Sequence, residues 1–198
     1  MSFTAGGLFL REAPRIAELF LGLRNWGMVR ETILKDNLLR LRTKSSGMRV
    51  SRELCDRLAC LDEDQLRLLI DGSEQERAAL LWLAVCRQYR FAREFAVEVI
   101  RDRFLTFQYQ LELSDFDVFF NSKAAWHKDL DTIAPSTQAK LRQVFFRVLT
   151  EAGLLSSQNM IQPLFLTKRV VQSIALNNRD DLLVFPATET ELKGLGHE

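Results

Sequence analysis

The sequence predicts a mainly α protein. A helical N-terminal bundle, residues 1–110, is expected to precede a winged-helix-like part, residues 111–198, with a small β-hairpin; the two could also pack as one compact domain. Apolar residues recur at helical spacing through most of the chain, and residues 74–105 contain neither Gly nor Pro. Residues 140–155 carry an apolar face and end at Gly153 before extended residues, as in the third helix and first wing strand of a winged helix.

The N-terminal part predicts helices with apolar residues three or four positions apart. They cover residues 13–23, about 28–42, about 50–60 and about 63–70. Pro14 suits the first turn of the first of these helices. The Ser- and Gly-containing segment at 43–47 is expected to be a polar turn.

The central segment begins with a strong helix-start signal. Ser73 and Glu76 have the spacing of a capping box, so a helical tract is expected over residues 74–105. Its first half, 78–86, is apolar on all sides, whereas its second half is apolar on one side only. This change predicts a kink or break near Arg87–Arg90.

The C-terminal part mixes helix and strand signals. Residues 106–113 suggest a linker or short strand, and further helices are expected over 115–122, near 127–133, over 137–152 and, after the Thr167 cap, over 168–177. The hairpin is expected to pair Leu154-Leu155 with Met160–Phe165, and the last strand to cover 181–186.

The composition bears on where the protein is located and on its cysteines. The longest uninterrupted apolar run, Ala78–Cys86, is nine residues, against roughly 20 for a membrane-spanning helix. The N-terminus lacks the basic start of a secretory signal, so we expect a cytoplasmic protein. The three cysteines lack CxxC spacing, which predicts neither disulfides nor a zinc site.

Residues suited to catalysis are few. His127 and His197 are far apart in sequence, and the closely spaced Asp pairs lie near expected helix ends, where Asp is favoured as a cap: Asp62/Asp64, Asp115/Asp117, Asp129/Asp131 and Asp180/Asp181. No phosphate-binding loop or nucleophile motif is present in the sequence. We therefore expect no enzymatic activity, no cofactor and no metal.

Charge is unevenly distributed although the net charge is only +1. Residues 24–57 carry nine Lys/Arg against four acids, whereas residues 58–79 carry two against six. The first block and the outer row of the 137–152 helix supply candidate nucleic-acid contacts: Arg42, Lys44, Arg49, Arg52, Lys140, Gln143 and Arg147. Solvated helix faces would produce the same pattern.

Several segments together resemble the BrxA family, the small helical component of bacteriophage-exclusion (BREX) defence systems. They are GGLFLREA at 6–13, NLLRLRTKSSGMRVSRELCDRL at 37–58, FAREFAVEVIRDRF at 91–104, KLRQVFFRVLTEAGLL at 140–155 and LLVFP at 182–186. Met48 stands where that family usually has Thr, which weakens the case for a hydroxyl contact to phosphate at that position. The resemblance implies a cytosolic, non-enzymatic accessory protein of phage resistance that contacts nucleic acid, other BREX components or both.

The sequence is compatible with two functions. One is phosphate-mediated binding of nucleic acid, with duplex DNA favoured over RNA; it predicts that Arg49 and Arg52 share one side of the molecule with Lys140 and Arg147. The other is a docking subunit of the defence complex, suggested by the acidic block and the aromatic-rich segment 104–120. Neither hypothesis predicts the oligomeric state.

Overall fold

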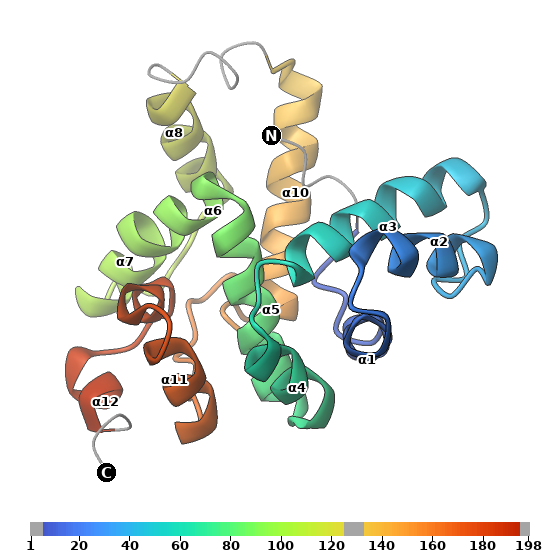
Figure 1. Ribbon diagram of the computed structural model, residues 1–198. Coiled ribbons are helices and arrows are strands. Elements are labelled where there is room, and N and C mark those ends of the chain that lie inside the picture. Colours follow the sequence, from blue (N-terminus) through green and yellow to red (C-terminus); the bar gives the residue numbers. More distant parts are fainter. Residues whose placement is uncertain (1–5, 125–132, 195–198) are drawn as a thin grey trace.

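The computed structural model describes residues 6–124 and 133–194, and its regular elements are helices (Figure 1). In chain order they are α1 (Ala13–Leu23), α2 (Trp26–Lys35), α3 (Lys44–Leu58), α4 (Glu63–Asp71), α5 (Glu74–Gln88), α6 (Arg90–Phe95), the π-helix η1 (Ala96–Arg101), α7 (Asp102–Leu105), α8 (Leu113–Ala124), α10 (Pro135–Glu151), α11 (Lys168–Ala175), the 3₁₀-helix η2 (Arg179–Val184) and α12 (Glu189–Gly194). The predicted mainly helical class is confirmed. No helix in these described ranges is long and apolar enough to cross a bilayer.

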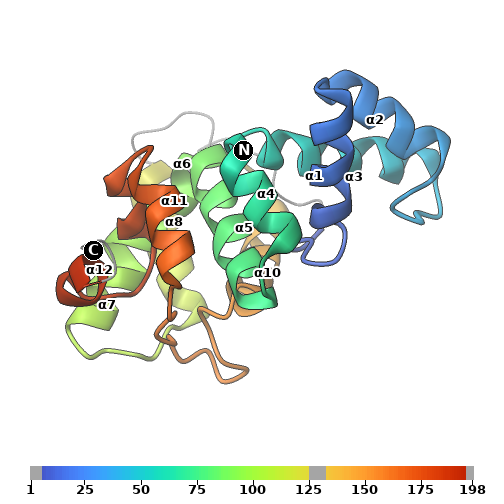
Figure 2. The ribbon, with the colours of Figure 1, turned by 60° about the horizontal axis from the view of Figure 1, so that its bottom comes forward.

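Helix α5 is the centre of the packing. Residues Ala78–Cys86 are all buried, as their all-round apolar character predicts, and α3, α4, α6, α10, α11 and η2 contact this helix. The buried Trp82 indole donates a 2.9 Å hydrogen bond to the Val184 carbonyl of η2. Figures 1 and 2 show α2 and α3 projecting to one side of α5, with α7, α11 and α12 on the other.

The helical tract breaks where the sequence predicts a kink. Tyr89 has extended φ and ψ angles, −122° and 106°, and separates α5 from α6. A cluster of phenylalanines then joins α6 to α8 and α10: the Phe95 ring lies 5.2 Å from that of Phe119 and 5.1 Å from that of Phe145, both edge-on. The core therefore runs through both parts of the chain.

Several predicted helix starts are present. The capping box of Ser73 and Glu76 forms, and the Thr167 hydroxyl caps α11 by accepting from the Val170 amide. Helix α10 corresponds to the predicted 137–152 helix; it begins two residues earlier, at Pro135, and ends one residue earlier, at Glu151.

The predicted boundary between the second and third helices is wrong. Helix α2 ends at Lys35, and the expected turn at 43–47 is instead the start of α3. Thr43 caps this helix by accepting from the Ser46 amide at 3.2 Å. Gly47 lies inside the helix, where a Cβ would come within 3.3 Å of the Leu34 side chain, so its role is close helix packing rather than a turn.

The predicted β-hairpin is wrong as a pair of strands. The turn closes, since the Ser156 amide donates to the Met160 carbonyl and the Gln162 amide to the Leu154 carbonyl, both at 2.9 Å. The pairing stops there because Pro163 has no N–H to continue it. Only isolated antiparallel bridges occur in the described residues, so the winged-helix assignment is not supported.

The last predicted strand is also wrong. Residues 181–186 fall largely within η2, whose start is capped by the Asn178 side chain. Its turns place Leu182 and Val184 in the core and leave the Val184 carbonyl for the Trp82 indole. The helix predicted near 127–133 lies almost wholly outside the described residues, as do His127 and His197.

Candidate nucleic-acid interface

The start of α3 carries cations where helices usually carry acids. Lys44 occupies the first helical position after the Thr43 cap, Arg42 precedes the cap, and the first turn has no acidic residue. Helices α4 and α5, in contrast, both begin with acids and capping boxes. A helix N-terminus bears partial positive charge and unpaired amide groups, so cations there are unfavourable until an anion binds.

The basic side chains around this helix start have no acidic partner in the part of the chain that the structure describes. Among the described residues, no carboxylate lies within 4.0 Å of the charged groups of Arg42, Lys44 or Arg49. The same holds for Lys35 and Arg40, two exposed neighbours that the sequence argument did not single out. We call Arg42, Lys44, Arg49 and Arg52 the α3 basic group.

The α3 basic group contributes side chains to two pockets. A pocket of about 300 Å³ is lined by Asn37, Arg42, Thr43 and Lys44 together with apolar side chains of α2 and the connection. A second pocket, of about 570 Å³, is lined by Arg49 and Arg52. Arg52 is 76% exposed and lies 3.6 Å from Asp56, so this surface pair holds it only weakly.

The side chains of the predicted row on α10 have more partners within the protein than Arg42, Lys44 and Arg49 have among the described residues. Lys140 donates a 3.0 Å hydrogen bond to the Gln143 side-chain oxygen. This bond occupies the oxygen with which Gln143 could have accepted a hydrogen bond from a base. Arg147 pairs with Glu151 at 2.7 Å, and the other Glu151 oxygen accepts from the Leu8 amide at 2.5 Å. The α10 row, defined as Lys140, Gln143 and Arg147, is therefore partly neutralised.

The two groups are connected only indirectly. The N-terminal segment joins the C-terminal ends of α3 and α10, since Arg57 donates to the Gly7 carbonyl at 2.8 Å and Leu8 donates to Glu151. No hydrogen bond or ion pair links the α3 basic group to the α10 row within the described ranges. That both groups face one side of the molecule stays a prediction.

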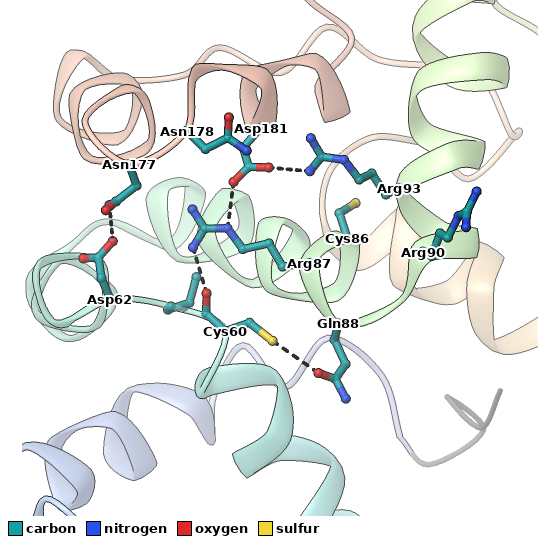
Figure 3. A pocket seen from close by; sticks show the side chains of 11 residues that line it. Cys60, Asp62, Cys86, Arg87, Gln88, Arg90, Arg93, Asn177, Asn178 and Asp181 are labelled. Atoms are coloured by element: carbon teal, nitrogen blue, oxygen red, sulfur yellow. Dashed lines mark hydrogen bonds and ion pairs between the residues drawn. The ribbon is translucent and has the colours of Figure 1, made fainter.

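Another arginine-rich pocket, of about 700 Å³, has a different character (Figure 3). Asp181 of η2 is buried and pairs with both Arg87, at 2.8 Å, and Arg93. Arg87 also donates to the Cys60 carbonyl and the Gln65 side chain, both at 2.8 Å. These arginines therefore hold α4, α5, α6 and η2 together, and both are already paired with the Asp181 carboxylate.

The cysteines show no sign of a reactive thiolate. Burial raises the pKa of the Cys86 thiol well above its usual value and raises that of Cys60 as well. Around them, no group of three or more His, Cys, Asp or Glu side chains that could hold a metal ion occurs in the described part of the chain.

Sequence reasoning missed Tyr89, which lines the same pocket as Arg49 and Arg52. The predicted break near Arg87–Arg90 was the available signal, because a residue at such a break can face out of the helix. It also missed Thr43 as the cap of α3, since the Ser/Gly content suggested a turn.

The fold and this surface define a helical protein with a cationic region at the start of α3, where Arg42, Lys44 and Arg49 have no acidic partner in the described ranges. The chain belongs to the BrxA family, whose model matches residues 1–178. It is 28% identical over 193 residues to the BREX protein BrxA of Escherichia coli O9:H4 (strain HS), covering 98% of this chain and 83% of that relative. It is also 28% identical over 130 residues to the BREX protein BrxA of Bacillus cereus (strain H3081.97), covering 66% and 65%.

A solved structure shares the fold. The crystal structure of an uncharacterized protein from Magnetospirillum magneticum aligns with a TM-score of 0.82 at 22% identity, covering 93% of this chain and 96% of that one. The two proteins therefore share the same overall helical fold.

Proposed function

We propose that the chain is a cytoplasmic, non-enzymatic component of BREX phage defence that binds nucleic acid, duplex DNA in preference to RNA, through backbone phosphates. Family membership and the names of its relatives support the defence role. The observation that carries the binding role is the cationic start of α3, where Arg42, Lys44 and Arg49 lack acidic partners among the described residues.

The electrostatics of α3 favour this proposal over a merely solvated surface. Lys44 beside the positive end of a helix dipole lowers the stability of the free protein. A phosphate placed there would interact favourably with the dipole, with unpaired amide groups and with several cations at once. Helix α11 also begins with a cation, Lys168, but its neighbour Arg169 lies 3.8 Å from Glu76, whereas Arg42 and Arg49 have no acidic partner among the described residues.

The α10 row would contribute less. Arg147 must exchange Glu151 for a phosphate, so part of the new Coulomb energy is offset by the pair that is lost. Lys140 needs only to give up a neutral hydrogen bond to Gln143. We therefore expect the α3 basic group to supply most of the affinity.

Fluorescence anisotropy with a labelled duplex tests the proposal. Arg49→Glu should weaken binding by about tenfold or more at low salt, because it removes one phosphate contact and adds repulsion. Arg147→Glu should weaken it less. Arg67→Glu on the acidic helix α4 serves as a control that leaves affinity unchanged. Unchanged affinity in both Arg49→Glu and Arg147→Glu would reject the assignment.

Protein docking is a second candidate because of Phe107. This side chain is 78% exposed and has a positive φ of 61°. The Phe107 amide donates to the Phe104 carbonyl and the Gln108 amide to the Arg103 carbonyl, the pattern of a helix end that normally favours Gly. Retaining an exposed aromatic there has a cost that a docking role would explain. Co-purification with other BREX proteins that survives nuclease and is lost in Phe107→Gly would support docking.

A further inference from the structure

The pocket lined by Arg49 and Arg52 has more than phosphate-binding chemistry. It measures about 570 Å³, within the roughly 300–1,000 Å³ range of small-ligand sites. Its other lining residues are Ser45, Met48, Glu53, Asp56 and Tyr89. A binder that contacts only the outside of a duplex needs cations on a surface, not a hollow with an aromatic wall.

The side chains that line this pocket differ in character. Arg49 and Arg52, one helical turn apart on α3, supply positive charge at its rim. Tyr89 brings an aromatic ring from the break between α5 and α6, and Met48, which is 50% exposed, brings a polarisable thioether. Asp56 adds carboxylate oxygens whose cation contacts are long, 3.6 Å to Arg52 and 3.9 Å to Arg30.

The aromatic wall is held in place from behind. The Tyr89 hydroxyl donates at 2.6 Å to Glu53, which also accepts from Arg57 at 2.7 Å. Arg57 is 2% exposed and anchored further by the Gly7 carbonyl, yet its Nη2 atom has no partner among the described residues. Glu53 thus links the buried Arg57 to the Tyr89 hydroxyl, and such a hydrogen-bonded support restricts the orientation of the Tyr89 ring.

We propose that this pocket binds one unpaired nucleotide of a nucleic-acid strand, with its phosphate on Arg49 and Arg52 and its base against Tyr89 and Met48. This inference rests on the proposed function and assigns the ligand of that same surface. A base inside a duplex has both faces covered by its neighbours, so only a base outside the stack can reach Tyr89. The Asp56 oxygens would accept hydrogen bonds from base N–H groups.

The test compares three probes by anisotropy. They are a fully paired labelled duplex, the same duplex with one unpaired adenosine, and free deoxyadenosine monophosphate as a competitor. The unpaired duplex should bind about tenfold more tightly than the paired one, from base–aromatic stacking of about 1–3 kcal/mol per base. The free monophosphate should compete only at far higher concentration, because it lacks the flanking phosphates.

Variants separate the pocket from the wider interface. Tyr89→Leu should remove the preference for the unpaired duplex, whereas Tyr89→Phe, which keeps the ring, should retain most of it. Met48→Ala should reduce the preference by about threefold, since it removes only part of the surface that faces the base. None of the three should change affinity for the paired duplex. If Tyr89→Leu does not fold, Met48→Ala decides, because Met48 is a half-exposed surface residue.

The outcomes distinguish this inference from the proposed function. Equal affinity for the paired and unpaired duplexes, with Arg49→Glu still weakening both, overturns the nucleotide pocket and leaves duplex binding intact. Competition by the free monophosphate at concentrations comparable to the duplex overturns the assignment to a strand and makes the ligand a free nucleotide. Absence of binding to every probe at low salt overturns both the inference and the proposed function.

Discussion

Reversing the charge of Lys44 should make the protein more stable and a poorer DNA binder. Lys44 is the first residue of α3, beside the positive end of the helix dipole. Removing the cation and adding an anion there each contribute about 0.3–1 kcal/mol at an exposed helix end, so Lys44→Glu should stabilise the fold by about 1 kcal/mol. For a chain of this size, that corresponds to a rise in Tm of about 2–4 °C.

The same change should weaken binding to duplex DNA. Loss of one phosphate contact reduces the magnitude of the salt slope, d log K/d log [salt], by about 0.9, and the new carboxylate repels the backbone. Thermal unfolding by circular dichroism and anisotropy titrations at several salt concentrations measure both effects on one preparation.

Lys168→Glu is the matched control. Lys168 also follows a Thr cap as the first residue of its helix, α11, which Figures 1 and 2 place on the other side of α5 from α3. This variant should leave DNA affinity unchanged. If Lys44→Glu raises Tm but binds DNA as well as the unchanged protein, the start of α3 does not contact phosphate. If Lys44→Glu lowers Tm, Lys44 does not interact unfavourably with the helix dipole.

Three further predictions concern the fold. Asp181→Asn should lower the free energy of unfolding, measured in urea, by about 2–3 kcal/mol because it leaves two arginines without their buried partner. Arg90→Gln, which removes an exposed ion pair, should change this free energy by less than about 0.5 kcal/mol. Equal effects of the two variants would contradict the structural role of Asp181. Phe107→Gly should stabilise the protein by about 0.5–1 kcal/mol, since Gly adopts positive φ without strain, and a lower Tm would show that the Phe107 backbone is not strained. The Thr167 hydroxyl, the Ser73 amide and a nearby arginine keep the pKa of Glu76 below its usual value of 4.5. The stabilising effect of Glu76 should therefore be present above about pH 4.5 and be lost as pH falls through the lowered pKa. Glu76→Gln should flatten the pH dependence of the free energy of unfolding in this acidic range, and an unaltered pH dependence would contradict the prediction.

The local signals in the sequence predicted the helices that depend on local chemistry. The capping box at Ser73 and Glu76, the Thr167 cap and the break near Tyr89 all follow from residues close together in the chain. The start of α3 could not be predicted in the same way. Gly47 is suited to a turn in isolation, and its helical role depends on the close approach of Leu34 from α2.

The final segment shows the same limit more clearly. Residues 182–185 form a short apolar run, as in a buried strand, but their conformation is fixed by Arg87, Arg93 and Trp82, about a hundred positions away in the sequence. Tertiary contacts of this kind override local preference. The expected hairpin failed for a local reason, since the sequence already contained Pro163, which ends the pairing.

The candidate site was only partly accessible from the sequence. The basic block at 24–57 was visible as charge, and the pairing of Arg147 with Glu151 could have been expected from their i,i+4 spacing. The absence of acidic partners around Arg42, Lys44 and Arg49 among the described residues required the fold. So did the pocket wall at Tyr89, whose partner Glu53 lies 36 positions away.

The most direct test of the central claim is the salt dependence of binding to duplex DNA. If the four cations of the α3 basic group each contact a phosphate, log K should fall linearly with log [salt] with a slope of about −3.6. Arg49→Gln should reduce that magnitude by about 0.9 without unfolding the protein. A slope near zero, or no binding at micromolar protein in low salt, would contradict the claim that α3 binds the DNA backbone.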